Sequence, residues 1–264
     1  MISRELLKWT KKLHQKKYRE EAGSFLIEGP NLIREALISD FRFLHLFVTP
    51  EFMKSKASAF VRPFSQKKEF LIHEVNRGEL KTISETKAPR GILAVVQKRK
   101  PVLEKNLLEK WQRVVLLDSL QEPGNLGTII RAADWYGFDA IILSRGSVES
   151  TNGKVLRATA GSFFHLPVFE DVLLQEAVSN LVMANFQVFA AAGSGTLEHY
   201  KIKFPKKTAL IIGNEGRGVR GDLLKEPVQT VRIPKGGRGE SLNAAMAATV
   251  LMDRVAFPGR ESIE

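Results

Sequence analysis

Two apolar segments near the end of the chain are each followed by a glycine-rich turn and then by polar residues that can begin a helix. Ile211-Ile212 leads into Gly213-Asn214-Glu215-Gly216-Arg217-Gly218, and Ile233-Pro234 leads through Gly236-Gly237 to Ser241-Leu242-Asn243. This pattern places bare backbone and a few polar side chains at the carboxyl ends of buried strands, which is where open α/β sheets bind ligands. It therefore predicts an α/β sheet with a ligand site at that end of its strands.

The chain from residue 105 onward alternates continuous apolar runs with stretches that favour helices. Continuous apolar runs are typical of strands covered on both faces, so this alternation predicts a doubly wound parallel sheet. The predicted strands are Val114–Leu117, Ala140–Leu143, Phe186–Ala191, Ala209–Ile212 and Val228–Ile233, with helices near residues 125–136, 153–160, 172–184 and 241–255.

The first hundred residues predict a second, smaller α/β unit. Its strands are expected at residues 24–28, 44–48, 70–72 and 91–96, and its helices at 1–20, 31–39 and 74–84. Lys98-Arg99-Lys100-Pro101 then breaks regular structure. Because 264 residues are many for one core, we expect two domains, residues 1–104 and residues 105–264.

Composition excludes several classes of protein. The chain has no cysteine, which excludes disulfides, thiolate nucleophiles and iron–sulfur ligation. Its five histidines are scattered and none pairs with an acid at metal-ligand spacing, so we expect no metal site. There is no apolar run of about 18 residues to span a membrane, and the N-terminus lacks the apolar stretch of a secretory signal. We expect a protein of the reducing cytoplasm.

The positive charge is concentrated at the N-terminus. The net charge is +11, of which residues 1–100 carry +10, with 21 Lys and Arg against 11 Asp and Glu. A cation cluster of this density suits a polyanion such as RNA. A solvated face, a membrane-surface helix or a transit peptide remain alternatives for this segment. The expected RNA-binding residues are Arg4, Lys8, Lys11, Lys12, Lys16, Lys17 and Arg19, with Trp9 and Tyr18 available for stacking.

Five polar residues stand where strands are expected to give way to helices: Asn125, Arg131, Glu215, Ser241 and Asn243. Each has a simpler reading as a helix cap, a turn residue or a solvated side chain. The loop around Glu215 is not a nucleotide-binding loop of the Walker type, because the Gly-Lys-Ser/Thr ending is absent. The acid would also repel phosphates, which favours a neutral or cationic ligand.

Three segments resemble the motifs of the SpoU, or TrmH-like, branch of the SPOUT RNA ribose methyltransferases. They are Asn125-Leu126-Gly127-Thr128-Ile129-Ile130-Arg131, Ile212-Gly213-Asn214-Glu215-Gly216, and Ile233-Pro234 through Asn243, in the family's order. Phe25-Leu26-Ile27-Glu28-Gly29 is also similar to the family's N-terminal substrate-binding domain, which is related to ribosomal protein L30e. The likeness extends over nearly the whole chain.

The resemblance implies a fold, a cofactor and an assembly. The implied fold is α/β, a C-terminal parallel-sheet SPOUT domain with a trefoil knot preceded by a smaller α/β domain like L30e. The implied methyl donor is S-adenosylmethionine, and the implied assembly is a homodimer with its active site at the subunit interface. The residues that this places around the donor are Ala192, Gly193, Thr196, Ile212, Gly213, Asn214, Gly216, Ile233, Pro234, Ser241, Leu242 and Asn243.

The same resemblance implies catalytic roles for Asn125, Arg131, Glu215, Ser241 and Asn243. Arginine stays protonated in proteins, so Arg131 is better suited to bind a substrate phosphate and stabilise the developing alkoxide than to act as a base. Glu215 would hold Arg131 or a partner across the interface, and Asn125 would orient the ribose or phosphate.

These observations predict an enzyme that 2′-O-methylates ribosomal or transfer RNA. Two alternatives stay open. One is a non-catalytic RNA-binding or ribosome-assembly factor that keeps the fold, and the other is a base-methylating SPOUT enzyme. Intact polar motifs favour catalysis over binding alone, and Ser241-Leu242-Asn243 favours ribose over base methylation. The additional N-terminal domain favours ribosomal RNA, by analogy.

Overall fold

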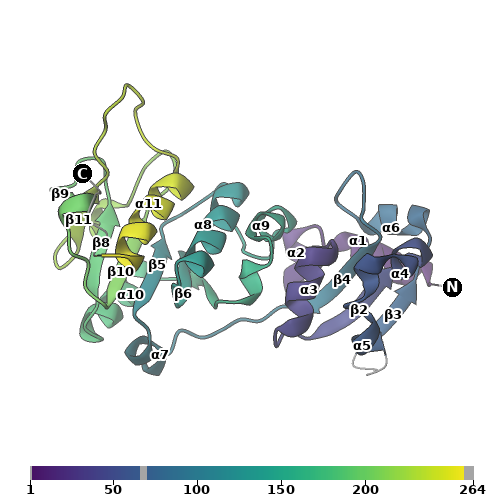
Figure 1. Cartoon of the computed structure of the whole chain (residues 1–264). Coiled ribbons are helices and arrows are strands. Elements are labelled where there is room, and N and C mark those ends of the chain that lie inside the picture. Colours follow the sequence, from purple (N-terminus) through teal and green to yellow (C-terminus); the bar gives the residue numbers. More distant parts are fainter. Residues whose placement is uncertain (1, 66–69, 259–264) are drawn as a thin grey trace. The chain divides into compact units, whose positions relative to one another are not determined.

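The computed structural model describes residues 2–65 and 70–258 (Figure 1). Contacts divide the chain into two compact units, unit 1 with Met1–Arg99 and Thr151–His165, and unit 2 with Lys100–Ser150 and Leu166–Glu264. The sequence predicts a division after residue 104 and places all of 105–264 in one domain. Residues 151–165 group instead with unit 1.

Unit 1 is built on a mixed four-stranded sheet with the order β1-β4-β2-β3. The central strand β4 runs antiparallel to both of its neighbours, and β2 and β3 are parallel. The strands are β1 (Ser24–Glu28), β2 (Phe43–Val48), β3 (Leu71–Glu74) and β4 (Ile92–Gln97). The α-helices are α1 (Arg4–Lys12), α2 (Lys16–Ala22), α3 (Pro30–Ile38), α4 (Pro50–Lys54), α5 (Arg62–Ser65), α6 (Arg77–Ile83) and α9 (Gly153–Thr159), and the 3-10 helices are η1 (Lys56–Ser58) and η2 (Ser162–Phe164).

Aromatic packing explains why residues 151–165 belong to unit 1. The Phe163 ring lies 5.9 Å from that of Phe25 in β1, and the Phe164 ring lies 5.1 Å from that of Phe41. Burying such rings against each other stabilises the contact beyond the area removed from water. A sequence pattern does not specify these long-range partners, so the grouping was not predicted.

The basic N-terminal segment forms two helices, where the sequence predicts one. The break at residues 13–15 is stabilised by Arg19, whose guanidinium donates to the carbonyl oxygens of Leu13 and His14 at 2.9 and 2.8 Å. The His14 ring contacts the carbonyl oxygen of Ile83 at the end of α6. Leu13 is fully buried and Trp9 packs against the same core. The apolar stripe of this segment is therefore covered by unit 1 itself, which argues against a membrane-surface helix.

Unit 2 contains the parallel sheet that the sequence predicts. Seven strands have the order β7-β6-β5-β10-β8-β11-β9, and every pair is parallel. The strands are β5 (Arg113–Leu117), β6 (Ala140–Ser144), β7 (Val168–Val172), β8 (Gln187–Ala191), β9 (Leu197–Glu198), β10 (Thr208–Ile212) and β11 (Gln229–Arg232). The helices are α7 (Lys105–Lys110), α8 (Pro123–Trp135), α10 (Leu174–Met183) and α11 (Ala244–Ala256), with η3 (His199–Lys201) and η4 (Gly221–Leu223). The sequence did not predict the edge strands β7 and β9.

Helices cover both faces of this sheet. Val114 and Leu116 of β5 share a buried cluster with residues of α7 and α10, and Val115 and Leu117 between them point to the other face by the alternation of a strand. On that face α8 and α11 lie side by side (Figure 1). The continuous apolar runs thus arise because both faces of each central strand are buried. In the described part of the chain, no helix is long and apolar enough to cross a membrane.

Candidate active site

The predicted site residues follow strands that are neighbours in the sheet of unit 2. In the order β5-β10-β8-β11 each strand is parallel to the next, so their carboxyl ends meet at one edge. Three loops there carry the predicted donor-lining residues: Ala192, Gly193 and Thr196 after β8, Ile212, Gly213, Asn214 and Gly216 at the end of β10, and Ile233, Pro234, Ser241, Leu242 and Asn243 after β11.

Asn243, Asn125 and Glu215 form one chain of hydrogen bonds across this edge. The Asn243 amide Nδ2 donates to Asn125 Oδ1 at 2.8 Å, and Asn125 Nδ2 donates to Glu215 Oε1 at 2.9 Å. Asn243 Oδ1 caps α11 by accepting from the backbone N–H groups of Ala245 and Met246. Because the Glu215 carboxylate can only accept and the backbone N–H groups at the start of α11 can only donate, both amides have one satisfactory orientation. These hydrogen bonds join three motifs that are far apart in sequence.

Glu215 is held as a carboxylate by the loop that precedes α8. Besides the amide of Asn125 it accepts the backbone N–H groups of Gln121 and Glu122, at 3.4 and 3.2 Å. Partial burial alone would raise the pKa of Glu215, but the hydrogen bonds from Asn125 and from the backbone outweigh it and lower the pKa below its usual range. The side chain is therefore ionised throughout the neutral range.

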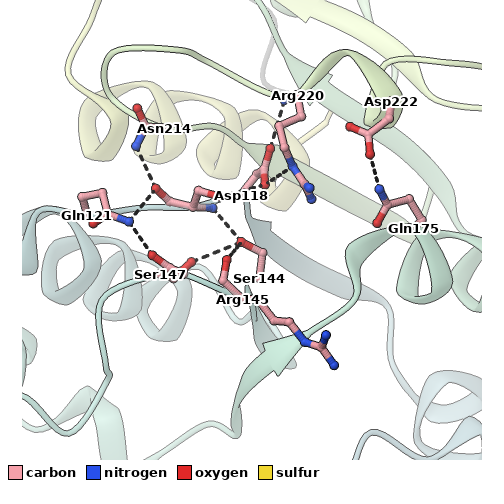
Figure 2. A network of polar contacts seen from close by, with 11 residues as sticks. Asp118, Gln121, Ser144, Arg145, Ser147, Gln175, Asn214, Arg220 and Asp222 are labelled. Carbon is pink, nitrogen blue, oxygen red and sulfur yellow. Dashed lines mark hydrogen bonds and ion pairs between the residues drawn. The ribbon is translucent and has the colours of Figure 1, made fainter. Parts of the chain in front are cut away.

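The glycine-rich loop after β10 has a fixed shape. Asn214 and Gly218 exchange backbone hydrogen bonds of 3.0 and 2.9 Å, and Asn214 Oδ1 accepts from the backbone of Gly216. Asn214 Nδ2 donates to the carbonyl oxygen of Ser119, which fastens the loop to the end of β5 (Figure 2). A Cβ atom on Gly213 would lie 2.1 Å from the carbonyl carbon of Gly218. Only glycine fits at that position.

The loop after β8 lies directly against β11. Ala192 donates its backbone N–H to Val231 at 2.9 Å, and a Cβ on Gly195 would lie 2.7 Å from the carbonyl carbon of Val231 and 2.8 Å from Arg232 N. Strand β11 leads at once into Ile233-Pro234, so two of the three loops that carry the predicted donor-lining residues are adjacent. Loops of bare backbone and small residues at neighbouring strand ends can bind a ligand through backbone groups and apolar contacts.

Arg131 and Ser241 do not take part in these contacts. Arg131 lies exposed on α8, and within residues 2–65 and 70–258 its side chain makes no hydrogen bond or ion pair. Glu215 is held by Asn125 and backbone amides, and among the described residues of one copy it makes no contact with Arg131. The predicted contact of Glu215 with Arg131 or with a partner across the interface stays a prediction. Ser241 and Leu242 are exposed in the loop that precedes α11.

Six of the seven basic residues that the sequence singles out are exposed on α1 and α2: Arg4, Lys8, Lys11, Lys12, Lys16 and Lys17. Lys12 and Lys17 lie 5.2 and 6.0 Å from the centre of the Tyr18 ring. Arg19 differs from them because it is buried and its guanidinium caps α1. It is a structural residue of unit 1, which removes it from the RNA-binding set.

One ion pair at the site was not predicted. Asp118 follows β5, is fully buried, and accepts from the backbone N–H and from Nε of Arg220 at 3.0 and 2.9 Å (Figure 2). Next to it Ser119 has a φ of 55° and donates its backbone N–H to Ser144 Oγ at 2.7 Å. The signal in the sequence is an acid directly after an apolar strand, which the local pattern does not distinguish from a turn residue.

Comparison with known families identifies both parts of the chain. The SpoU rRNA Methylase family model matches residues 112–253, and the MRM3-like substrate binding domain model matches residues 5–94. Among known relatives, the 23S rRNA (guanosine(2553)-2′-O)-methyltransferase RlmP of Bacillus subtilis is 35% identical over 242 residues, which cover 92% of this chain and 92% of the relative.

Solved structures resemble the whole chain. The AdoMet-bound rRNA methyltransferase from Sinorhizobium meliloti has a TM-score of 0.83 and 28% identity, covering 99% of this chain and 97% of its own. The SpoU methyltransferase AviRb from Streptomyces viridochromogenes, in complex with AdoMet, has a TM-score of 0.82 and 25% identity, covering 97% of this chain and 98% of its own.

Proposed function

Because this chain belongs to the SpoU rRNA methylase family, we propose that the Asn243–Asn125–Glu215 chain marks the place where it methylates a ribose of ribosomal RNA. The protein is an S-adenosylmethionine-dependent RNA 2′-O-methyltransferase. The relative RlmP is named for 23S rRNA, and we extend to this enzyme the class of acceptor, ribosomal RNA, but not the nucleotide.

The hydrogen-bonded chain is the single observation that carries this proposal. Asn125, Glu215 and Asn243 come from three motifs spread over more than a hundred residues, and they meet at 2.8 and 2.9 Å. A plain helix cap would need only Asn243, and a plain turn would need only the loop around Glu215. An arrangement that satisfies all three side chains at once fixes a polar surface before substrate arrives, which is how a site avoids reorganisation during reaction.

The three adjacent loops would hold the methyl donor. S-adenosylmethionine supplies an electrophilic methyl group on a sulfonium sulfur. The loop of residues 192–196 and the segment Ile233-Pro234 would surround its adenosine with backbone groups, and Gly213 would permit close approach at the end of β10. The ionised Glu215 suits a cationic donor better than a phosphate.

The acceptor would be positioned from the α8 side. A ribose 2′-hydroxyl is a poor nucleophile, so the largest contribution of the protein is to bring it in line with the methyl group. Arg131, exposed on α8, would bind the neighbouring phosphate and stabilise the alkoxide that develops as the hydroxyl loses its proton. Asn125 would orient the ribose while Glu215 and Asn243 hold its amide in place.

The exposed cations of α1 and α2 would dock the RNA. Each phosphate that they neutralise releases condensed counterions, which adds affinity without sequence preference. Tyr18, flanked by Lys12 and Lys17, offers a ring on which an unpaired base can stack.

A second copy of the chain would complete the site. Trp135 on α8 and Met246 on α11 are 82% and 63% exposed, and these two helices lie side by side on one face of unit 2. Large exposed apolar residues on neighbouring helices are typical of an interface between subunits. We propose a homodimer through this face, with Arg131 contributed across the interface. A C-terminal trefoil knot and a cytoplasmic location belong to the same proposal.

Methyl transfer to separate pools of RNA tests this function. The protein is incubated with labelled donor and with ribosomal RNA or transfer RNA, and the product is hydrolysed with alkali. Methylation of a ribose 2′-hydroxyl protects the adjoining linkage, so label is expected in alkali-resistant dinucleotides from ribosomal RNA. Label on a base would favour the base-methylating alternative, and no label in either pool would favour a binding factor.

A further inference from the structure

Arg220 presents a guanidinium group to solvent at the same edge of the sheet as the proposed active site. It follows the loop that carries Glu215, and its backbone N–H and Nε both donate to the carboxylate of Asp118. Asp118 is fully buried, whereas the side chain of Arg220 is 48% exposed. The buried carboxylate therefore holds Nε of the guanidinium in place and leaves the outer part of the group in solvent.

The two terminal nitrogens of Arg220 are available to a ligand. Figure 2 shows Nε turned toward Asp118, and in the ranges that the structure describes no hydrogen bond or ion pair engages Nη1 or Nη2. These two nitrogens form a planar fork that can bind two oxygens of one phosphate. An arginine already held by a carboxylate also loses less side-chain entropy on binding than a free one.

The carboxylates near Arg220 would by themselves repel a polyanion. Glu215 is ionised, since its pKa is lowered, and the carboxylate of Asp222 is engaged by Gln175. Residues 101–264 carry 19 Lys and Arg against 18 Asp and Glu, so this part of the chain has little general excess of positive charge. RNA that reaches an edge lined with carboxylates needs a fixed cation there to offset their repulsion.

We propose that Arg220 binds a backbone phosphate of the RNA strand that carries the acceptor ribose, with Asp118 as the residue that positions it. This inference rests on the proposed function, because it presumes that RNA enters this edge of the sheet. It adds to the basic helices of unit 1 a contact within the methyltransferase unit.

Four variants of the full-length protein test the proposal. Arg220→Gln removes the charge, Arg220→Lys keeps the charge but loses the fork, and Asp118→Asn keeps Arg220 but weakens its anchor. Lys225→Gln is the matched control, because Lys225 is an exposed cation five residues further on and the change in net charge is the same. For each variant, the affinity for protein-free ribosomal RNA is measured between low and moderate salt, together with the affinity for S-adenosylmethionine and the melting temperature.

The proposal predicts that Arg220→Gln weakens RNA binding roughly tenfold at low salt and lowers the slope of log Kd against log salt by about one. Arg220→Lys and Asp118→Asn should weaken binding less and keep the slope, because the charge remains. Lys225→Gln should keep both affinity and slope. Donor affinity should stay within about twofold of the wild type in all four, since the lost contact is to phosphate.

RNA affinity and salt slope equal to the wild type in Arg220→Gln would overturn the proposal and leave Arg220 a structural partner of Asp118. A loss of donor affinity without a loss of RNA affinity would overturn it as well. If Arg220→Gln does not fold, Arg220→Lys decides: wild-type RNA affinity there contradicts the fork. A wild-type protein that binds RNA without methylating it would contradict the proposed function, while the salt slope would still decide the role of Arg220.

Discussion

Replacing Asn125 by Asp tests the hydrogen-bonded chain with the smallest change of shape. Asn125 is buried, donates to Glu215 at 2.9 Å and accepts from Asn243 at 2.8 Å. Asn125→Asp keeps the acceptor that faces Asn243 but puts an oxygen, and at neutral pH a second negative charge, against the carboxylate of Glu215. One donor is lost and a like-charge contact is created.

The magnitude follows from the geometry. Two like charges about 4 Å apart repel by about 4 kcal/mol at an effective dielectric constant of about 20. The variant can avoid part of this cost by protonating the new carboxyl, whose pKa is raised above about 3.9 both by burial and by Glu215. We expect a net cost of about 3 kcal/mol at pH 8, which corresponds to a loss of roughly a hundredfold in kcat/KM.

The sign of the pH dependence distinguishes this mechanism from simple damage. The protonated carboxyl can donate to Glu215 as the amide does, so activity relative to the wild type should recover as the pH falls through the raised pKa and decline as the pH rises. Asn106→Asp is a matched control, because exposed Asn106 also donates its amide to a glutamate, Glu104, at 3.2 Å. Its activity should stay near wild type at every pH.

The assay is initial-rate methyl transfer to ribosomal RNA between pH 5.5 and 8.5, with donor affinity measured in parallel. Activity of Asn125→Asp within about threefold of the wild type at pH 8, with an unchanged pH profile, would refute the claim that the amide of Asn125 holds the site together. An equal loss of activity in Asn106→Asp would show that the effect is not specific to the hydrogen bonds of Asn125.

Three further changes follow from the same geometry. Glu215→Gln keeps the shape but weakens the charge-assisted hydrogen bonds, so turnover should fall about fivefold. Because the pKa of Glu215 is lowered, the contribution of its charge is complete above the ordinary glutamate pKa of about 4.3 and is lost only below it. A ratio of variant to wild-type turnover that varies between pH 6 and 9 would contradict this. Arg131→Ala should abolish turnover and leave donor affinity, measured by calorimetry, almost intact, whereas an equal loss of donor affinity would remove Arg131 from the acceptor side. Gly213→Ala should lower the free energy of unfolding, measured by urea titration, by roughly 1–3 kcal/mol, the typical cost of overpacking, because the new Cβ would lie 2.1 Å from the backbone of Gly218. Gly221→Ala is the control, because the space around its Cβ is open. Equal stability of the two variants would contradict the close approach at Gly213.

The parallel sheet was predictable because its central strands are buried on both faces and therefore consist of continuous apolar runs. Strand β7 was not, because two acids interrupt its pattern. Glu170 accepts the backbone N–H of Ser150 at 2.7 Å, and Asp171 has a φ of 58°. The first is a partner outside the sheet and the second an irregular backbone at its edge, and periodicity carries no information about either.

The break in the N-terminal helix was missed for a related reason. Apolar residues recur at helical spacing up to Leu13, and no proline or glycine interrupts residues 1–20, so the local pattern favours one helix. The structure ends α1 there because Arg19 donates to the exposed carbonyl oxygens of Leu13 and His14. An arginine within a basic run predicts an RNA contact, whereas the burial of Arg19 among backbone acceptors gives it a structural role.

The position of Asn125, Glu215 and Asn243 at one edge of the sheet was predictable, because each of the three follows an apolar strand or stands at the start of a helix. Their partners were not. Sequence spacing places Asn125 and Glu215 at one edge of the sheet, but only the geometry shows that an amide rather than Arg131 faces the carboxylate. The Asp118–Arg220 pair joins residues separated by 102 positions, and no local signal distinguishes it from two turn residues.

The most direct test of the proposed chemistry is the identity of the methylated nucleoside. Ribosomal RNA treated with the wild-type protein and a donor carrying a deuterated methyl group is digested to nucleosides and analysed by mass spectrometry, with the Asn125→Asp protein at pH 8 in parallel. A single deuterated 2′-O-methylnucleoside, formed by the wild type and reduced about a hundredfold in the variant, is the predicted result. A deuterated base, or equal yields of 2′-O-methylnucleoside from both proteins, would contradict it.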